Sequence, residues 1–172
     1  YQNGKIEVNG EPTEVAIVNQ GLDKGKNKNE LYMAMPRVNE IPFDSNRKMM
    51  TTIHKIGNKY RIITKGAPEI LIKKCTKYLN GNTNINMTVE KINYINRQNE
   101  EMASRALRVI AVSYKDVDVL PNKIDTRIEN DLTFCGLIGM IDPPREGVKE
   151  AIGVCKRAGI KTVMITGDHI LT

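Results

Sequence analysis

The sequence has few aromatic residues and few cysteines, and both scarcities exclude classes of protein. Its 172 residues include no tryptophan, and the aromatic fraction is 5%. Modules that bind single-stranded nucleic acid stack bases on aromatic side chains, so this scarcity argues against nucleic acid as a partner despite a net charge of +6. The sequence has three cysteines, Cys75, Cys135 and Cys155, which is an odd number, and no two of them form a CxxC pair. They favour a reducing compartment over a disulfide framework.

Long apolar runs are also absent. The longest, FCGLIGMI, has the length of a strand, whereas a membrane-spanning helix needs about 18 residues or more. The chain starts at a tyrosine without a charged and apolar leader behind it, so we expect no signal peptide. A start without methionine, and an end within the pattern MITGDHILT, lead us to expect a piece of a longer chain.

Helical and extended patterns alternate over most of the chain, which predicts an α+β fold with an antiparallel sheet flanked by helices. The first helix is expected to begin near Pro12 and to end at Gly21. Extended runs on both sides of Gly57 and Asn58 predict a β-hairpin. We expect further helices over 67–79 and 88–107, polar connections over 81–87 and 118–131, a short helix ending at Pro36, and strands over 108–117 and 132–142.

The last forty residues follow a different pattern. A strand ending at Asp142, a helix closed by Gly159 and an apolar run ending at Asp168 predict a β-α-β unit with parallel strands. Carboxylates at the carboxyl edge of such a sheet lie where Mg²⁺ and phosphate are handled. The alternative is that both aspartates are ordinary turn residues.

Three residues in the first part of the chain are candidates for ligand binding. Lys65 stands where the strand of YRIITKGAPEILIKKC gives way to a helix, so its long cationic side chain either reaches an anionic or electron-rich ligand or is solvated in a loop. Phe43 either stacks on a planar base or belongs to the core. Lys48 follows it at an odd offset, and a bulge or turn at DSN would bring both to one pocket.

Six motifs occur in a fixed order along the chain: GEPTE, IPFDSNRKMM, KGAPE, SRALRVIAVSY, DPPREGV and MITGDH. In this order they resemble the cytoplasmic nucleotide-binding region of P-type cation-transporting ATPases, and IPFDSNRKMMTTI is most similar to calcium-translocating bacterial pumps. The resemblance implies a nucleotide-binding domain over residues 1–137. It implies a hinge and part of the haloacid-dehalogenase-like phosphorylation domain over residues 138–172.

The resemblance also implies a binding site for ATP. Phe43 would stack on adenine, Glu14 would lie near the adenine amino group, and Lys48 and Lys65 would line the pocket. The remaining implied residues are Gly66 and Ala67, which let the backbone approach the ring, Arg108 and the weaker candidate Arg105 at the polyphosphate, Asp142 and Arg145 at the hinge near the ribose and phosphates, and Thr166, Gly167 and Asp168 in a phosphate-site loop.

Several parts of the family pattern are missing from the sequence. It contains neither the DKTGT motif of the phosphorylated aspartate nor a GDGxND segment. We therefore expect the chain to bind ATP without hydrolysing it. In the intact pump, a cytoplasmic domain of this kind works with Mg²⁺ and with the remaining phosphorylation, actuator and transmembrane domains of a plasma-membrane protein. Ser45 stands where many calcium pumps carry an arginine, which predicts weak phosphate contact.

Two other functions are compatible with parts of the sequence. A phosphohydrolase of the haloacid-dehalogenase type would explain the two aspartates of the β-α-β unit, but it needs a nucleophilic aspartate in a DxD or DKT-like sequence. The chain has no DKT-like sequence, and its one DxD match, Asp116-Val117-Asp118, lies outside the predicted β-α-β unit. A basic nucleic-acid-binding module would explain the charge, and it predicts binding that weakens steeply with salt.

Overall fold

The computed structural model describes residues 10–141 and 145–165. The described residues form a seven-stranded sheet in the order β1-β2-β3-β6-β7-β4-β5. The strands are β1 (Arg37–Asp44), β2 (Met49–Ile56), β3 (Lys59–Gly66), β4 (Cys75–Asn80), β5 (Thr83–Asn86), β6 (Arg108–Val117) and β7 (Leu132–Met140). Neighbouring strands are antiparallel except β4 and β7, which are parallel. The α+β class expected from the sequence is confirmed.

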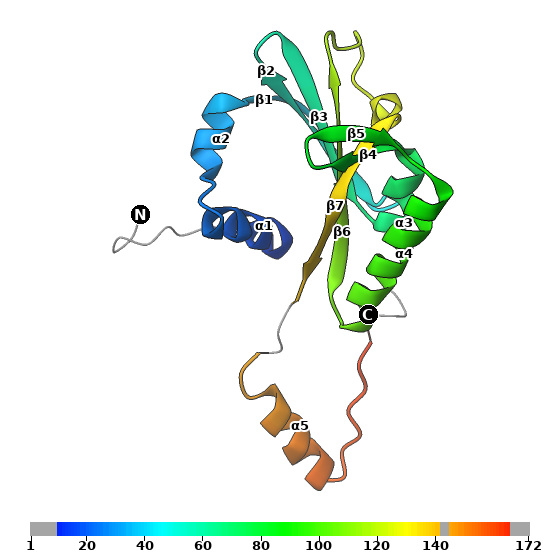
Figure 1. The fold of residues 1–172 in the computed structure, drawn as a ribbon. Coiled ribbons are helices and arrows are strands. Elements are labelled where there is room, and N and C mark those ends of the chain that lie inside the picture. The colour runs from blue at the N-terminus through cyan, green and yellow to red at the C-terminus, as the bar shows by residue number, and fades with distance from the viewer. Residues whose placement is uncertain (1–9, 142–144, 166–172) are drawn as a thin grey trace.

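Helices lie on both sides of this sheet (Figure 1). The helices are α1 (Pro12–Asp23), α2 (Lys28–Ala34), α3 (Pro68–Leu71), α4 (Val89–Ser104) and α5 (Val148–Arg157), with 3₁₀ turns η1 (Ile72–Lys74) and η2 (Thr126–Glu129). Of these, α5 lies on neither face but beyond the end of β7 (Figure 1). Figure 1 shows α1 and α2 on one side of the sheet and α3 and α4 on the other. Buried residues of α3 and α4 pack against one face of the sheet, whereas α1 and α2 contain no buried residue.

The first helix begins as expected and ends later than expected. Pro12 occupies its first position, but the helix continues through Gly21 to Asp23. Gly25 supplies the left-handed residue instead, with a φ of 69°, and the Lys26 amide donates to the Gly21 carbonyl at 2.8 Å. This is the hydrogen-bond pattern of a Schellman stop, so the glycine four residues later ends the helix.

The hairpin predicted around Gly57 and Asn58 is confirmed. Ile56 pairs with Lys59 across a two-residue loop, and Gly57 has a φ of 56°. Hairpin loops of this length require positive φ, which glycine adopts without strain. The loop fixes the register of β2 against β3, and hence the position of Lys65.

The helix predicted over residues 67–79 is wrong beyond its first turn. The chain leaves α3 at Leu71, and residues 75–80 form β4 instead, with Tyr78 opposite Phe134 of β7. The expected polar connection over 81–87 contains β5, joined to β4 by a two-residue loop in which Gly81 has a φ of 60°. Pairing with the distant β7 outweighs the local helical spacing of these residues.

The helix predicted over 88–107 begins where the sequence places it, with Thr88 as its N-cap, and ends earlier, at Ser104. The Thr88 side chain accepts a hydrogen bond from the Lys91 amide at 3.2 Å and caps α4. Ile95 of this helix is buried with Ala111 and Phe134 of the sheet, so α4 covers this face.

Removing the Thr88 cap tests how much α4 depends on it. We expect Thr88→Ala to lower the free energy of unfolding by about 1 kcal/mol, because the Lys91 amide loses its acceptor. Urea unfolding followed by circular dichroism measures this change. Thr88→Ser keeps an acceptor oxygen and is the matched control; an equal loss in both variants would contradict the capping role.

Cys75, the first residue of β4, is buried in the core with Leu71 of α3 and Ala111 of β6. Burial raises the pKa of its thiol to about 12, with the Ser113 hydroxyl opposing the shift. The folded state keeps the thiol neutral to a higher pH than the unfolded state, in which the thiol ionises near 9.0. The contribution of this group to stability is therefore fully present below pH 9.0, and it is lost as the pH rises above that value, because ionisation then stabilises the unfolded chain.

This shift predicts the reactivity of Cys75. At pH 9 we expect iodoacetamide to leave Cys75 unmodified in the folded chain, because the thiolate is the reactive form. In urea the same residue should be alkylated readily. Peptide mass spectrometry reads the site of labelling, and rapid labelling of Cys75 without urea would show that the core around β4 is open.

The predicted β-α-β unit is wrong for the residues that the structure describes. Helix α5 forms and closes at Gly159, whose φ is 75°, and the Ile160 amide donates to Cys155 at 2.9 Å. Residues 160–165 form no strand, and Val163, Met164 and Ile165 are 73%, 86% and 93% exposed. An extended apolar run becomes a strand when a neighbour takes up its backbone hydrogen bonds, and here no described neighbour does so.

Candidate functional site

Lys65 lies near the end of β3, between Met50 of β2 and Val112 of β6. Its Nζ atom forms an ion pair with Oε1 of Glu14 on α1, and the two side chains are 21% and 48% exposed. Successive residues of a strand point to opposite faces, so Lys65 and the fully buried Thr64 face opposite sides of the sheet. The ion pair joins α1 to the sheet on the Lys65 face.

Gly66 and Ala67 bring the end of β3 against Lys48. A Cβ atom at Gly66 would lie 2.4 Å from the Lys48 carbonyl oxygen and 2.5 Å from Met49 Cβ. The Ala67 amide donates to the same Lys48 carbonyl at 2.9 Å. The small residues thus allow a close approach of the chain's own backbone, while the approach of a ligand to them stays a prediction.

Lys48 ends a tight turn that connects β1 to β2. Asp44 Oδ1 accepts hydrogen bonds from the amides of Asn46 and Arg47 at 3.0 and 2.8 Å, and the Lys48 amide donates to the Asp44 carbonyl at 2.7 Å. Lys48 itself has a φ of 50°, a left-handed conformation that costs a lysine about 1 kcal/mol. The β1 register shifts between Ile41 and Asp44, so the bulge or turn predicted at DSN is confirmed.

Phe43 is 64% exposed on β1, one residue before this turn. The alternative that Phe43 belongs to the core is therefore wrong. The Lys48 side chain, on the other arm of the turn, is also largely exposed, with its Nζ atom 3.9 Å from Glu69 Oε1. An exposed aromatic ring and two cationic side chains thus stand at or beside one end of β2 and β3.

The remaining predicted residues are spread over other elements. Arg108 begins β6 opposite Met140, four residues or about 13 Å along the strand from the Val112 that pairs with Lys65. Arg105 ends α4 and pairs with Glu101 at 2.8 Å. Arg145 lines a cavity of about 400 Å³ at the start of α5. Asp142, Thr166, Gly167 and Asp168 lie outside the described residues.

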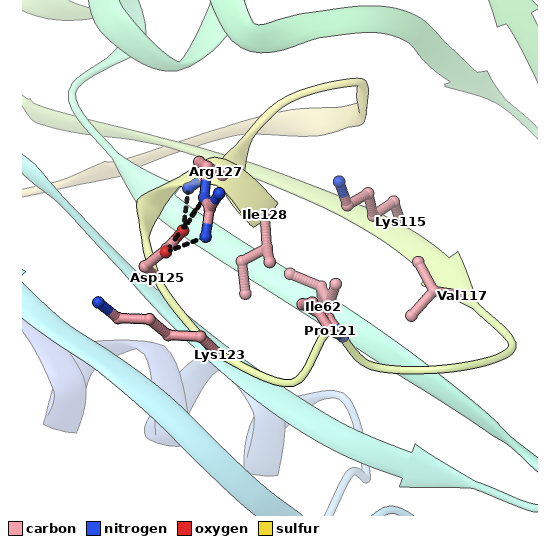
Figure 2. Close-up of a pocket in the computed structure, with 8 residues that line it drawn as sticks. All are labelled: Ile62, Lys115, Val117, Pro121, Lys123, Asp125, Arg127 and Ile128. Carbon is pink, nitrogen blue, oxygen red and sulfur yellow. Dashed lines mark hydrogen bonds and ion pairs between the residues drawn. The ribbon is translucent and has the colours of Figure 1, made fainter.

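A cavity of about 410 Å³ lies on the opposite face from Lys65 (Figure 2). Its floor includes Ile62, which shares the face of Thr64, and Lys115 stands at its edge. Burial lowers the pKa of Lys115, with Asp131 opposing the shift. Arg127 forms a two-pronged ion pair with Asp125, and this hydrogen bonding holds the pKa of that carboxyl at about 2. No residue of the predicted nucleotide site lines this cavity, so cavity and site are separate.

Sequence reasoning missed a buried ion pair behind the site. Glu129 is fully buried, and its Oε1 atom lies 2.5 Å from Nη1 of Arg47. The sequence placed Glu129 in a polar connection over 118–131, where Asn130 and Asp131 follow it, so no local signal singled it out.

Two features are absent from the part of the chain that the structure describes. Within residues 10–141 and 145–165, no group of three His, Cys, Asp or Glu side chains is arranged to hold a metal ion. Among the helices of the same ranges, none has the length and apolar character needed to cross a membrane.

Comparison of the sequence with known proteins shows the family to which the chain belongs. The family model described as P-type ATPase, cytoplasmic domain N, matches residues 1–147. The chain is 44% identical over 161 residues to Calcium-transporting ATPase 1 of Bacillus cereus, which is 93% of this chain and 18% of that protein. It is 42% identical over 164 residues to Calcium-transporting ATPase 1 of Lactococcus lactis, covering 95% and 19%. It is 36% identical over 174 residues to the plasma membrane-type Calcium-transporting ATPase 2 of Arabidopsis thaliana, covering 99% and 17%.

These matches show the family: the chain belongs to the P-type cation-transporting ATPases and contains their cytoplasmic domain N. It spans about a fifth of the length of the curated relatives that it matches. The resemblance seen in the six sequence motifs is therefore confirmed at the level of family and domain.

Proposed function

We propose that this chain binds ATP at the end of β3 and serves as the nucleotide-binding domain of a calcium-transporting P-type ATPase. One observation carries the proposal. At the end of β3, Lys65 is ion-paired with Glu14 of α1, and the adjoining Gly66 and Ala67 lie against the Lys48 carbonyl of the β1–β2 turn. The exposed Phe43 ring, on the other arm of that turn, supports stacking on a planar base.

Each group has a defined role in the proposed complex. The Phe43 ring stacks on adenine, while Glu14 accepts a hydrogen bond from the adenine amino group. Lys48 and Lys65 provide the cationic wall of the pocket, and Arg108, farther along β6, faces the polyphosphate. Because Lys65 and Glu14 are paired with each other, the incoming base has to compete with this ion pair.

In the intact protein the proposed role extends beyond this chain. The domain over residues 1–137 holds ATP so that its γ-phosphate reaches an aspartate elsewhere in the polypeptide, and calcium is the proposed cargo. Mg²⁺ bound with the nucleotide supplies charge neutralisation at the phosphates. Asp142, Arg145 and the loop Thr166–Asp168 belong to the proposed hinge and phosphorylation domain.

The exposed apolar surface of the C-terminal segment supports this wider proposal. Ile152 and Val154 of α5 are exposed along with residues 163–165, and an unpaired apolar surface of this kind is typical of an interface. We propose that it packs against further parts of the phosphorylation domain in a cytoplasmic assembly tethered to a membrane. The alternative of a stand-alone phosphohydrolase relied on the β-α-β unit, whose second strand the described residues do not form.

A titration of the purified chain with ATP tests the proposal. NMR spectra should show saturable shifts at Phe43, Lys65 and Ala67, and no phosphate should be released. Adding a duplex oligonucleotide at low salt should leave the signals of Phe43, Lys65 and Ala67 unshifted, and this addition tests the alternative of a nucleic-acid-binding module. Release of phosphate from ATP would instead favour the phosphohydrolase, and spectra that ATP leaves unchanged would contradict nucleotide binding.

A further inference from the structure

Glu129 places a carboxylate in the interior of the domain. Its side chain is fully buried at the end of η2, and Oε1 accepts hydrogen bonds from Arg47 Nη1 at 2.5 Å and from Thr51 Oγ1 at 2.7 Å. Its second oxygen, Oε2, has no hydrogen-bond partner in the described part of the chain. Burying a charge is unfavourable unless its partners are held in good geometry, so this carboxylate fixes the groups that bind it.

Arg47 links this carboxylate to the turn between β1 and β2. While Nη1 binds Glu129, Nη2 donates to the Pro42 carbonyl at 2.7 Å. Pro42 directly precedes Phe43, and Arg47 directly precedes Lys48. The guanidinium therefore clamps both arms of the turn at the residues next to the two proposed ligand groups.

A row of buried hydroxyls links the same carboxylate to β3. Thr51, Thr64 and Ser113 face one another across β2, β3 and β6. The Oγ1 atoms of Thr51 and Thr64 are 2.9 Å apart, and the Ser113 hydroxyl donates to the Thr64 carbonyl at 3.3 Å. Thr64 directly precedes Lys65, whose side chain emerges on the other face of the sheet.

We propose that Glu129 is a positioning residue for the nucleotide site. From the face opposite the ligand, it holds the Phe43–Lys48 turn through Arg47 and the end of β3 through Thr51 and Thr64. This inference rests on the proposed function, and it assigns Glu129 no contact with the nucleotide. Groups held in their binding geometry before the ligand arrives lose less conformational freedom on binding, so the network raises affinity by preorganisation.

Substitutions at the clamp separate positioning from general stability. Arg47→Lys keeps the charge but cannot reach Glu129 and Pro42 together in a fork. Ile128→Val is the matched control, since it removes one methylene from the core beside Glu129 and leaves the ion pair intact. Dissociation constants for ATP and for adenosine, and the melting temperature, are measured for each chain at a temperature where all are folded.

We expect Arg47→Lys to raise the dissociation constants for ATP and for adenosine by the same factor of about 10, because the clamp positions the groups that bind the base. Glu129→Gln, which keeps an acceptor oxygen for Arg47 and Thr51, should weaken both ligands by less. Ile128→Val should lower the melting temperature and leave both dissociation constants unchanged.

The outcomes that contradict the inference differ from those that contradict the proposed function. If the unaltered chain fails to bind ATP, the proposed function is wrong and the inference falls with it. If the unaltered chain binds and both clamp variants bind equally well, the positioning role alone is overturned. Weakening in Ile128→Val to the level of Arg47→Lys would also overturn it, because affinity would then follow stability.

Discussion

Replacing Phe43 with alanine is expected to weaken ATP binding by about 5- to 150-fold. Stacking of a base on an aromatic side chain contributes about 1–3 kcal/mol by alanine substitution, and each 1.4 kcal/mol corresponds to a factor of 10 in the dissociation constant. Because the side chain is 64% exposed, its removal should change the free energy of unfolding by less than about 0.5 kcal/mol. Isothermal titration calorimetry with ATP measures the first change and urea unfolding the second.

Two further variants test whether the loss of ATP affinity comes from the aromatic ring at position 43. Phe43→Tyr retains an aromatic face and should bind ATP nearly as well as the unaltered chain. Tyr94 is another exposed aromatic residue, on α4 across the sheet from α1 (Figure 1), so Tyr94→Ala should leave ATP affinity unchanged. Equal ATP affinities in Phe43→Ala and the unaltered chain would contradict the stacking role. Lys48 and Lys65 would then be the remaining proposed groups of the pocket.

Elements that depend on local signals could be predicted from the sequence. The Gly57–Asn58 dipeptide predicted its hairpin, and Thr88 predicted the start of α4. The Gly81–Asn82 dipeptide carried the same hairpin signal and was missed. There the apolar residues of 70–78 also fitted a helical period, and the strand is stabilised by Leu132 and Phe134, which lie far along the chain. Short apolar runs remain ambiguous until such a partner is known.

The candidate site shows the same division. The residue types at positions 43, 48 and 65 made them candidates for ligand binding, with structural alternatives for Phe43 and Lys65, and the exposure of Phe43 removes its core alternative. The ion pair between Lys65 and Glu14 joins residues 51 positions apart, and the bond between Thr51 and Glu129 joins residues 78 positions apart. Contacts at such separations are set by how the elements pack, so no local pattern in one sequence marks Glu129 as the group behind the site.

Gly66→Ala is expected to have the largest effect on stability. The added Cβ would lie 2.4 Å from the Lys48 carbonyl oxygen and 2.7 Å from Met49 Cα, and both are backbone atoms. Gly66 is paired with Met49 on one side and Ala111 on the other, so neither strand can move away without breaking its hydrogen bonds. We expect the free energy of unfolding to fall by about 3 kcal/mol, as measured by urea denaturation.

Gly136→Ala is the matched control for this substitution, since it adds the same methyl group to β7 where no atom lies within 4 Å. It should leave stability within about 0.5 kcal/mol of the unaltered chain. Similar stabilities for the two variants would mean that the end of β3 does not sit against Lys48. The contact between Gly66 and Lys48 also fixes the neighbouring residues Lys65 and Ala67. Gly66→Ala should therefore weaken ATP binding in the fraction of the chain that still folds, whereas Gly136→Ala should not. Gly66 thus has an observed role in strand packing and a proposed role in ligand approach, and the two effects separate when stability and affinity are measured on the same variant.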